Sequence, residues 1–290
     1  MKKEIFTLIL AFFCVYAINA QDLTSKKGLP ILPEKGDYSL SIDAVPFLQY
    51  IGNMFHGNST SPAPTFDFPG LGTTPMWTVQ GKKFISSTTA IRARIRLGFS
   101  DNTVKNTILD ETNSTATPAY VDDKWTETKM NIILGAGIEK RKGKGRVQGV
   151  YGAMANIMLS THGNKVVYGN AMNSDYNTPL STVYPWVSDG SGGYPTENAS
   201  TRVVKYNDGL GFGIGVNAFL GIEYFFAPKM SIGGEFSWGV LLQLNGKSNV
   251  GSETWDASGI TSSTYKSGGT TYFGFDNGNS GGAINLNFYF

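Results

Sequence analysis

Alternation of apolar with polar or small side chains at a period of two limits the folds open to this chain more than any other feature. It is clearest from Tyr206 to Phe226, where every even position from Leu210 to Ile222 is apolar. Successive side chains of a strand point to opposite faces, so the pattern predicts a strand with one apolar face. An amphipathic helix would instead repeat its apolar positions every three or four residues.

The same alternation recurs along the chain and predicts an all-β protein. Tight turns at 81–83, 141–145 and 227–229 and polar loops at 52–70, 101–124, 161–205 and 246–269 separate the segments. Short and long connections in strict succession are typical of an eight-stranded antiparallel transmembrane β-barrel with an up-and-down meander. The predicted strands are 37–50, 72–80, 84–100, 125–140, 146–160, 206–226, 230–245 and 270–290, the last with a bulge near 276–281.

Composition agrees with a strand-built membrane protein. Hydrophobic residues make up 41% and charged residues only 16%, against about 25% charged in soluble proteins. No apolar run after residue 20 approaches the about 20 residues of a membrane-spanning helix. Barrel strands need no such run, because only alternate residues face lipid.

The N-terminus predicts export. Met1-Lys2-Lys3-Glu4 precedes an apolar run that ends at Asn19-Ala20-Gln21, as in a secretory signal peptide. We expect a signal peptide at 1–20, a periplasmic tail at 21–36 and one barrel domain at 37–290. The only cysteine, Cys14, lies in the leader, so the mature chain has no thiol chemistry. Without the leader, which contains two lysines and one glutamate, the formal net charge falls from +2 to +1, which gives no support for a nucleic-acid partner.

The C-terminal segment carries the strongest resemblance to a known family. Ile284, Leu286, Phe288 and Phe290 fall on one face of the last predicted strand. A terminal aromatic strand of this kind resembles the closing strand of bacterial outer-membrane barrels. The resemblance implies that these four residues form the signal recognised by the barrel-insertion machinery.

The chain from residue 21 onward resembles the OmpA/OmpX-like family of eight-stranded outer-membrane barrels. The Asn-Ala-Gln leader end and the Phe-Ala-Pro-Lys turn at 226–229 resemble the small barrels of the Bacteroidota most. The resemblance implies an integral outer-membrane protein with turns in the periplasm and long loops outside the cell. Its implied partners are outer-membrane lipid, lipopolysaccharide, the insertion machinery and other outer-membrane proteins.

Charged residues on the predicted inner faces indicate a filled interior. An eight-stranded barrel is just wide enough inside for side chains, and buried charges there must pair. We predict a structural network of ion pairs; the alternative is a narrow gated channel. Its predicted members are Asp43, Arg92, Arg94, Arg96, Glu127, Lys129, Glu139, Arg146, Glu223 and Glu235.

Catalytic and metal-binding patterns are sparse. Two histidines, His56 and His162, fall in predicted loops, which leaves a barrel enzyme that modifies lipid A or peptides as the alternative function. They are too few for a protein-only zinc site, and the loop carboxylates at 110, 111, 122 and 123 lack an EF-hand spacing. We expect no enzyme activity, no cofactor and no metal.

The long loops are the predicted functional surface. Rigid scaffolds commonly place recognition on loops, and the third loop mixes aromatic residues with Gly, Ser and Asn. We expect a structural or adhesion role, or a subunit role in an outer-membrane complex; the other possibilities are a lid over the barrel mouth and a hydrophilic shield without a specific partner. The predicted recognition residues are Tyr168, Tyr176, Tyr184, Trp186 and Tyr194.

Overall fold

The computed structural model describes residues 23–43, 77–112, 117–188, 190, 193–275 and 281–290. Over these ranges the chain forms strands, turns and irregular segments without a helix. The described part therefore holds no helix of the length and hydropathy needed to cross a membrane. Its strands are β1 (Tyr38–Asp43), β2 (Trp77–Ser86), β3 (Thr89–Leu109), β4 (Tyr120–Lys142), β5 (Val147–Val167), β6 (Leu180–Thr182), β7 (Thr196–Asn198), β8 (Thr201–Ala227), β9 (Met230–Asn245), β10 (Asn249–Asp256), β11 (Gly259–Lys266), β12 (Thr270–Phe275) and β13 (Gly281–Tyr289).

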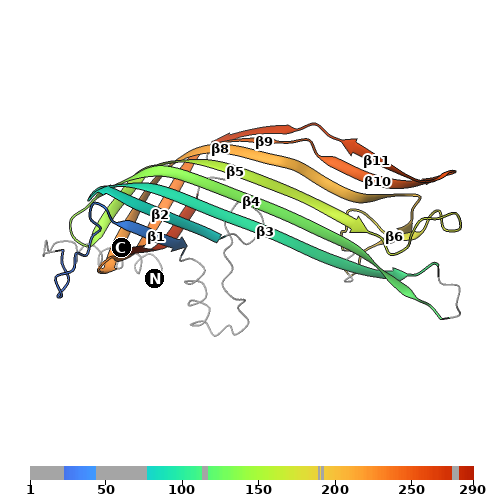
Figure 1. Cartoon of the computed structure of the whole chain (residues 1–290), viewed down its shortest axis with the longest axis horizontal. Coiled ribbons are helices and arrows are strands. Elements are labelled where there is room, and N and C mark those ends of the chain that lie inside the picture. Colours follow the sequence, from blue (N-terminus) through green and yellow to red (C-terminus); the bar gives the residue numbers. More distant parts are fainter. Residues whose placement is uncertain (1–22, 44–76, 113–116, 189, 191–192, 276–280) are drawn as a thin grey trace, which may run out of the picture.

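Eight of these strands pair in a closed ring. Around the ring the order is β1, β2, β3, β4, β5, β8, β9 and β13, and β13 pairs again with β1. All pairings are antiparallel, which confirms the all-β antiparallel architecture. The long strands run side by side along the molecule (Figure 1).

The sheet contains eleven strands rather than the eight predicted, because two predicted strands are longer and interrupted. β10 follows β9 after a short bend and takes over the pairing with β8. β11 pairs with β10, and β12 pairs with β9. Residues 246–269, predicted to be a polar loop, thus contain the β10–β11 hairpin, and the predicted bulge at 276–280 lies outside the described residues.

Strand pairing also extends into two other segments that were predicted to be loops. β3 and β4 form one hairpin whose pairing runs to Leu109 and Tyr120, through most of the predicted loop 101–124. β5 continues to Val167 and β8 begins at Thr201, inside the predicted loop 161–205. In these extensions neither face is consistently apolar, so the period-two signal disappears although the backbone hydrogen bonds continue.

One predicted turn is wrong. Gly81-Lys82-Lys83 lies within β2, where it pairs with β1 and β3, and the turn is at residues 87–88. Ser and Thr at 87–88 give a weaker turn signal than Gly and two lysines. The β8–β9 turn lies at Pro228–Lys229, as predicted. We call the end of the ring with the 87–88, 143–146 and 228–229 turns the turn end, and the opposite end the loop end.

The two faces of the ring differ as the alternation predicts. On β3, Ile91, Ile95 and Phe99 are exposed on the outside, whereas Arg92 and Arg96 are buried inside. Water-soluble proteins distribute these residue types the other way round. The ring is thus apolar outside and polar inside.

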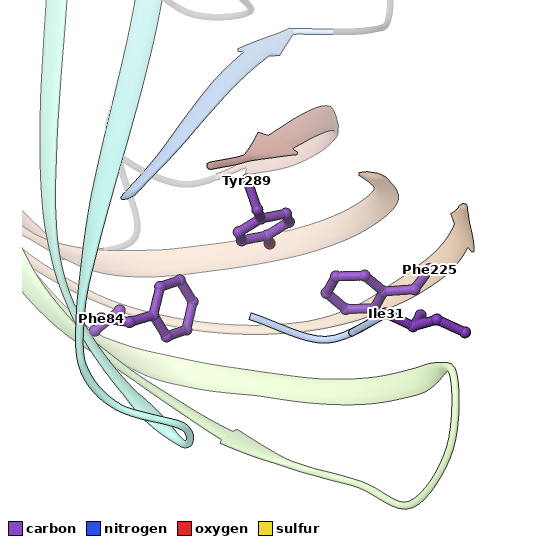
Figure 2. Packing of buried hydrophobic residues seen from close by; sticks show 5 residues of the cluster. Ile31, Phe84, Phe225 and Tyr289 are labelled. Carbon is purple, nitrogen blue, oxygen red and sulfur yellow. The ribbon is translucent and has the colours of Figure 1, made fainter. Parts of the chain in front are cut away.

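An apolar cluster closes the interior at the turn end. Phe84, Phe225 and Tyr289 point toward one another from β2, β8 and β13, with Phe84 and Phe225 ring centroids 5.8 and 5.4 Å from that of Tyr289 (Figure 2). Ile31, from the segment that precedes β1, completes the cluster and is buried. Its carbonyl also accepts a hydrogen bond from the Lys229 backbone N–H. The predicted tail therefore contributes to the core of the turn end.

Candidate functional site

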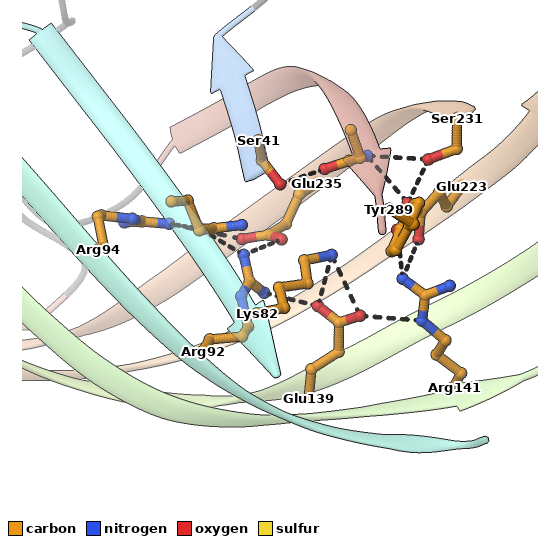
Figure 3. Close-up of polar contacts among 12 residues, drawn as sticks. Ser41, Lys82, Arg92, Arg94, Glu139, Arg141, Glu223, Ser231, Glu235 and Tyr289 are labelled. Carbon is orange, nitrogen blue, oxygen red and sulfur yellow. Dashed lines mark hydrogen bonds and ion pairs between the residues drawn. The ribbon is translucent and has the colours of Figure 1, made fainter. Parts of the chain in front are cut away.

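A buried charged layer lies in the interior of the ring (Figure 3). It adjoins the apolar cluster, because the Arg141 guanidinium lies over the Phe84 and Phe225 rings at 4.7 and 5.5 Å. Glu139, fully buried, lies 2.9 Å from Lys82 Nζ, 3.1 Å from Arg141 Nε and 3.5 Å from Arg92 NH1. Inward positions of β2, β3 and β4 supply these groups. We define the charged layer as Lys82, Arg92, Arg94, Glu139, Arg141, Glu223 and Glu235.

Glu223 is the second centre of this layer. Arg141 NH2 lies 2.6 Å from its carboxylate, and the hydroxyls of Tyr289 and Ser231 donate to it. The Asn287 amide donates a further hydrogen bond of 2.9 Å. A buried carboxylate with this many donors has its charge well compensated.

Glu235 is the third carboxylate. Arg92 NH2 lies 2.8 Å away and Arg94 NH2 3.8 Å away, and both guanidinium groups also donate to the Gln80 side chain. Arg92 additionally stacks over the Phe219 ring at 4.0 Å. The layer thus links β2, β3, β4, β8, β9 and β13 through side chains that hold one another in place.

The structure places the predicted network residues in different regions. The charged layer contains Arg92, Arg94, Glu139, Glu223 and Glu235, and Arg96 is buried on the same face. The prediction is wrong for Arg146, which is exposed at the turn end and donates to the backbone carbonyls of Phe225 and Phe226. Glu127 and Lys129 pair with each other at 2.9 Å nearer the loop end. The side chain of Asp43 lies outside the described residues.

Sequence reasoning missed Lys82 and Arg141. Both were assigned to tight turns, but β2 and β4 continue through them. The period-two alternation could have identified them: Lys82 shares its strand face with Gln80, and Arg141 shares its strand face with Glu139.

A polar cavity of about 550 Å³ opens at the loop-end mouth of the ring. His162 on its wall joins two strands: Nδ1 lies 2.7 Å from Asp208 and Nε2 lies 3.0 Å from Glu127. Lys129 lies 2.9 Å from Glu127, so Lys129 and His162 both engage this carboxylate. We call this space the mouth cavity; its lining includes Lys129, Ser160, His162, Tyr206, Gln243 and Asn245.

This geometry bears on the catalytic and metal hypotheses. Both ring nitrogens of His162 face carboxylates, which leaves neither of them directed at a serine or a substrate. His56 lies outside the described residues. Among the residues that are described, no group of three or more His, Cys, Asp or Glu side chains is placed to hold a metal ion.

Asp123 anchors the third predicted loop to the extended strands. Its fully buried carboxylate accepts hydrogen bonds of 2.7 Å each from the backbone N–H groups of Gly169 and Thr182 and from the Thr182 hydroxyl. Asn170 bridges further, with its amide donating to the carbonyls of Leu109 and Leu180. We call the described residues of segment 168–199 (168–188, 190 and 193–199) the loop cap.

The predicted recognition residues take part in the packing of the loop cap. Trp186 is only 6% exposed; its ring stacks on Trp125 of β4 at a centroid separation of 6.3 Å and packs at a tilt against Tyr194 at 5.3 Å. Tyr168 lies under the Arg202 guanidinium at 4.3 Å and donates to the Val203 carbonyl. Burial raises the pKa of the Tyr168 hydroxyl above its usual value. Tyr176 and Tyr184 are half-buried, so none of the five is a freely exposed ring.

The predicted insertion segment keeps its alternation. Ile284 and Phe290 are exposed on the outer face of β13 and just beyond it, whereas Asn287 and Tyr289 are buried inside. Leu286 and Phe288 share the outer face and are half-buried. Phe290 stacks on Tyr38 of β1 at 6.5 Å.

Comparisons with known proteins identify no family. No family model matches the chain, and no curated protein matches it. Among solved structures, the chain is similar to a major outer membrane protein from Thermus thermophilus, with 10% sequence identity and a TM-score of 0.28. That similarity covers 88% of this chain and 99% of the other.

Proposed function

We propose that this chain is an integral outer-membrane protein whose ring of eight strands is a transmembrane barrel. The observation that carries the proposal is the height of the apolar outer face. On β8 the outward side chains from Leu210 to Ile222 are all apolar and exposed or half-buried, over a rise of twelve residues. At about 3.4 Å per residue and a tilt of about 40°, they span about 31 Å, against about 30 Å for the hydrocarbon core of a bilayer and about 25 Å for the apolar band of known barrels.

The edges of this band support the same proposal. Tyr38, Tyr151 and Tyr224 are exposed on the outer face near the turn end. Aromatic rings of this kind concentrate at membrane–water interfaces. In water, a continuous apolar belt around the ring would be far larger than the exposed patches that soluble monomers carry.

The interior supports a structural role rather than catalysis or conduction. The charged layer occupies the ring between the apolar cluster and the mouth cavity, and its carboxylates are engaged by buried cations. His162 is held by two carboxylates. We therefore propose that the protein is not an enzyme and acts at its loop end, as a structural or adhesion component or as a subunit of an outer-membrane complex. We also propose that the chain is related to the OmpA/OmpX-like barrels of the Bacteroidota, which its sequence pattern resembles.

Extraction tests membrane integration. We expect the protein to stay in the outer-membrane fraction after alkaline washing, to require detergent, and to migrate on gels with heat-dependent mobility. A purified chain that is folded and monomeric in plain buffer would refute the proposal. Conductance in planar bilayers that disappears on Arg94 substitution would replace the structural role with that of a channel.

Cysteine labelling tests the orientation. The chain after residue 20 has no cysteine, so Ala257→Cys in the β10–β11 turn and Lys144→Cys in the β4–β5 turn each create a single thiol. In intact cells a membrane-impermeant maleimide should label only the Ala257 variant. Both should react after lysis, and labelling of Lys144→Cys in intact cells would contradict the orientation.

A further inference from the structure

Four exposed lysines form a patch on the outer face of the ring toward the loop end. They lie on four adjacent strands, β3, β4, β5 and β8. In the strand register Lys105 is directly opposite Lys124, and Lys165 is directly opposite Lys205. We call Lys105, Lys124, Lys165 and Lys205 the lysine patch.

This arrangement is electrostatically unfavourable without a counter-ion. Like charges directly opposite each other on one face of a sheet are destabilising. Within the described part of the chain, the lysine patch makes one ion pair, between Lys105 and Asp122 at 3.5 Å. The cations of the charged layer, by contrast, each have a carboxylate within 4 Å. The patch therefore offers uncompensated positive charge to an external anion.

The height of the patch specifies the kind of anion. Lys105 and Lys124 each lie six residues beyond Phe99 and Met130, where the continuous apolar outer runs of their strands end; only one hydrophobic pair, Leu109–Tyr120, lies farther out on the same face of the two strands. Six residues of a tilted strand rise about 15 Å. A phospholipid headgroup layer is only about 5–8 Å thick on each side of the hydrocarbon. An anion at the level of the patch must sit on a taller headgroup.

We propose that the lysine patch binds the anionic groups of a saccharide-bearing lipid headgroup in the outer leaflet, of the lipopolysaccharide class. The inference rests on the proposed membrane location and adds a binding site to it. Ammonium groups pair well with phosphate or carboxylate as point charges, and four on adjacent strands engage several such groups together.

The test uses the full chain in detergent micelles, titrated with purified lipopolysaccharide. The patch variant carries Lys105→Gln, Lys124→Gln, Lys165→Gln and Lys205→Gln. The matched control carries Lys83→Gln, Lys140→Gln, Lys142→Gln and Lys144→Gln, four exposed turn-end lysines. We expect at least about tenfold weaker binding by the patch variant and unchanged binding by the control, since each lysine near an anionic surface contributes on the order of 1 kcal/mol, or about fivefold. Equal loss in both variants, or no loss in the patch variant, would overturn the proposal.

Three ligand arms separate the possible sources of the anion. Chemically dephosphorylated lipopolysaccharide should bind more weakly than the intact form, with the difference abolished in the patch variant. Inorganic phosphate alone, or phosphatidylglycerol alone, binding the patch as tightly as lipopolysaccharide would refute the tall-headgroup assignment. Heat-dependent gel mobility of every variant reports barrel folding, so failure of the membrane proposal is seen separately from failure of the lysine patch.

Discussion

The turn-end half and the loop-end half of the ring share one backbone ladder but use charge in opposite ways. In the turn-end half, the members of the charged layer point inward and lie within hydrogen-bond or ion-pair distance of one another, as around Glu139. In the loop-end half, Lys165 and Lys205 point outward from opposed positions without a carboxylate partner in the described residues. The difference indicates that the inner charges serve the fold, whereas the outer ones remain available for something outside the chain.

The largest effect should come from breaking the charged layer. Glu139→Leu removes the carboxylate that faces Lys82, Arg92 and Arg141, and uncompensated buried charge typically costs about 3–5 kcal/mol. We expect that loss in the free energy of unfolding by urea, followed by gel mobility in micelles. Asp122→Asn, which alters only the exposed contacts of Asp122 with Lys105 and Thr107, is the control and should cost far less, because exposed ion pairs contribute little. Similar values for the two variants would show that the inner charges are as dispensable as the outer ones.

A smaller, local effect is expected where the loop cap joins the extended strands. Asp123→Ala leaves the donors of Gly169 and Thr182 without their buried acceptor, which should weaken docking of the cap by about 2–3 kcal/mol. Limited proteolysis should then cleave within residues 168–199 while the ring keeps its gel mobility, and the fluorescence of the now exposed Trp186 should shift to the red. Asp122→Ala, the neighbouring outward position, should leave the cap protected. Protection of the cap in both variants would disprove the anchoring role of Asp123.

Adjacent residues at the C-terminus sharpen the comparison between the inner and outer faces. Tyr289→Phe keeps the ring that packs on Phe84 but removes the hydroxyl that donates to Glu223, at a cost of about 1–2 kcal/mol in unfolding. Phe290→Ala changes an outward ring, 72% exposed, and should lower stability less while slowing assembly into the outer membrane. A pulse-chase experiment that follows the appearance of the heat-modifiable folded form measures the assembly rate of each variant. Slower assembly for Tyr289→Phe but not for Phe290→Ala would contradict the insertion role assigned to the outer face.

The accuracy of the predictions from sequence also differs between the turn-end half and the loop-end half. In the turn-end half, one face is apolar and the other polar, so β9 was predicted at its observed bounds, 230–245. Both faces of the loop-end extensions are largely polar, so the β10–β11 hairpin was predicted as a loop. The charged layer was predicted only in part, since the lysine of Gly81-Lys82-Lys83 resembled a turn residue. Trp186 illustrates what alternation cannot show: loop aromatics that pack on their own scaffold look, in sequence, like a binding surface.

The smallest expected effect is a pH response at the tip of the β10–β11 hairpin. Hydrogen bonds from the Ser258 and Thr261 side chains lower the pKa of Asp256 to about 2, against about 3.9 in an unfolded chain. Because the folded pKa is the lower one, the stabilisation is present above about pH 4 and is lost as the pH falls through 2. NMR titration of the Ser258 and Thr261 amides in micelles should give a midpoint near 2 in the wild type and no transition in Asp256→Asn. A wild-type midpoint near 4 would mean that these contacts do not hold the carboxylate. The Asp256 carboxylate would then be stabilised by no side chain of its own hairpin. The hairpin would differ even more from the turn-end interior, where each carboxylate of the charged layer has a cation partner.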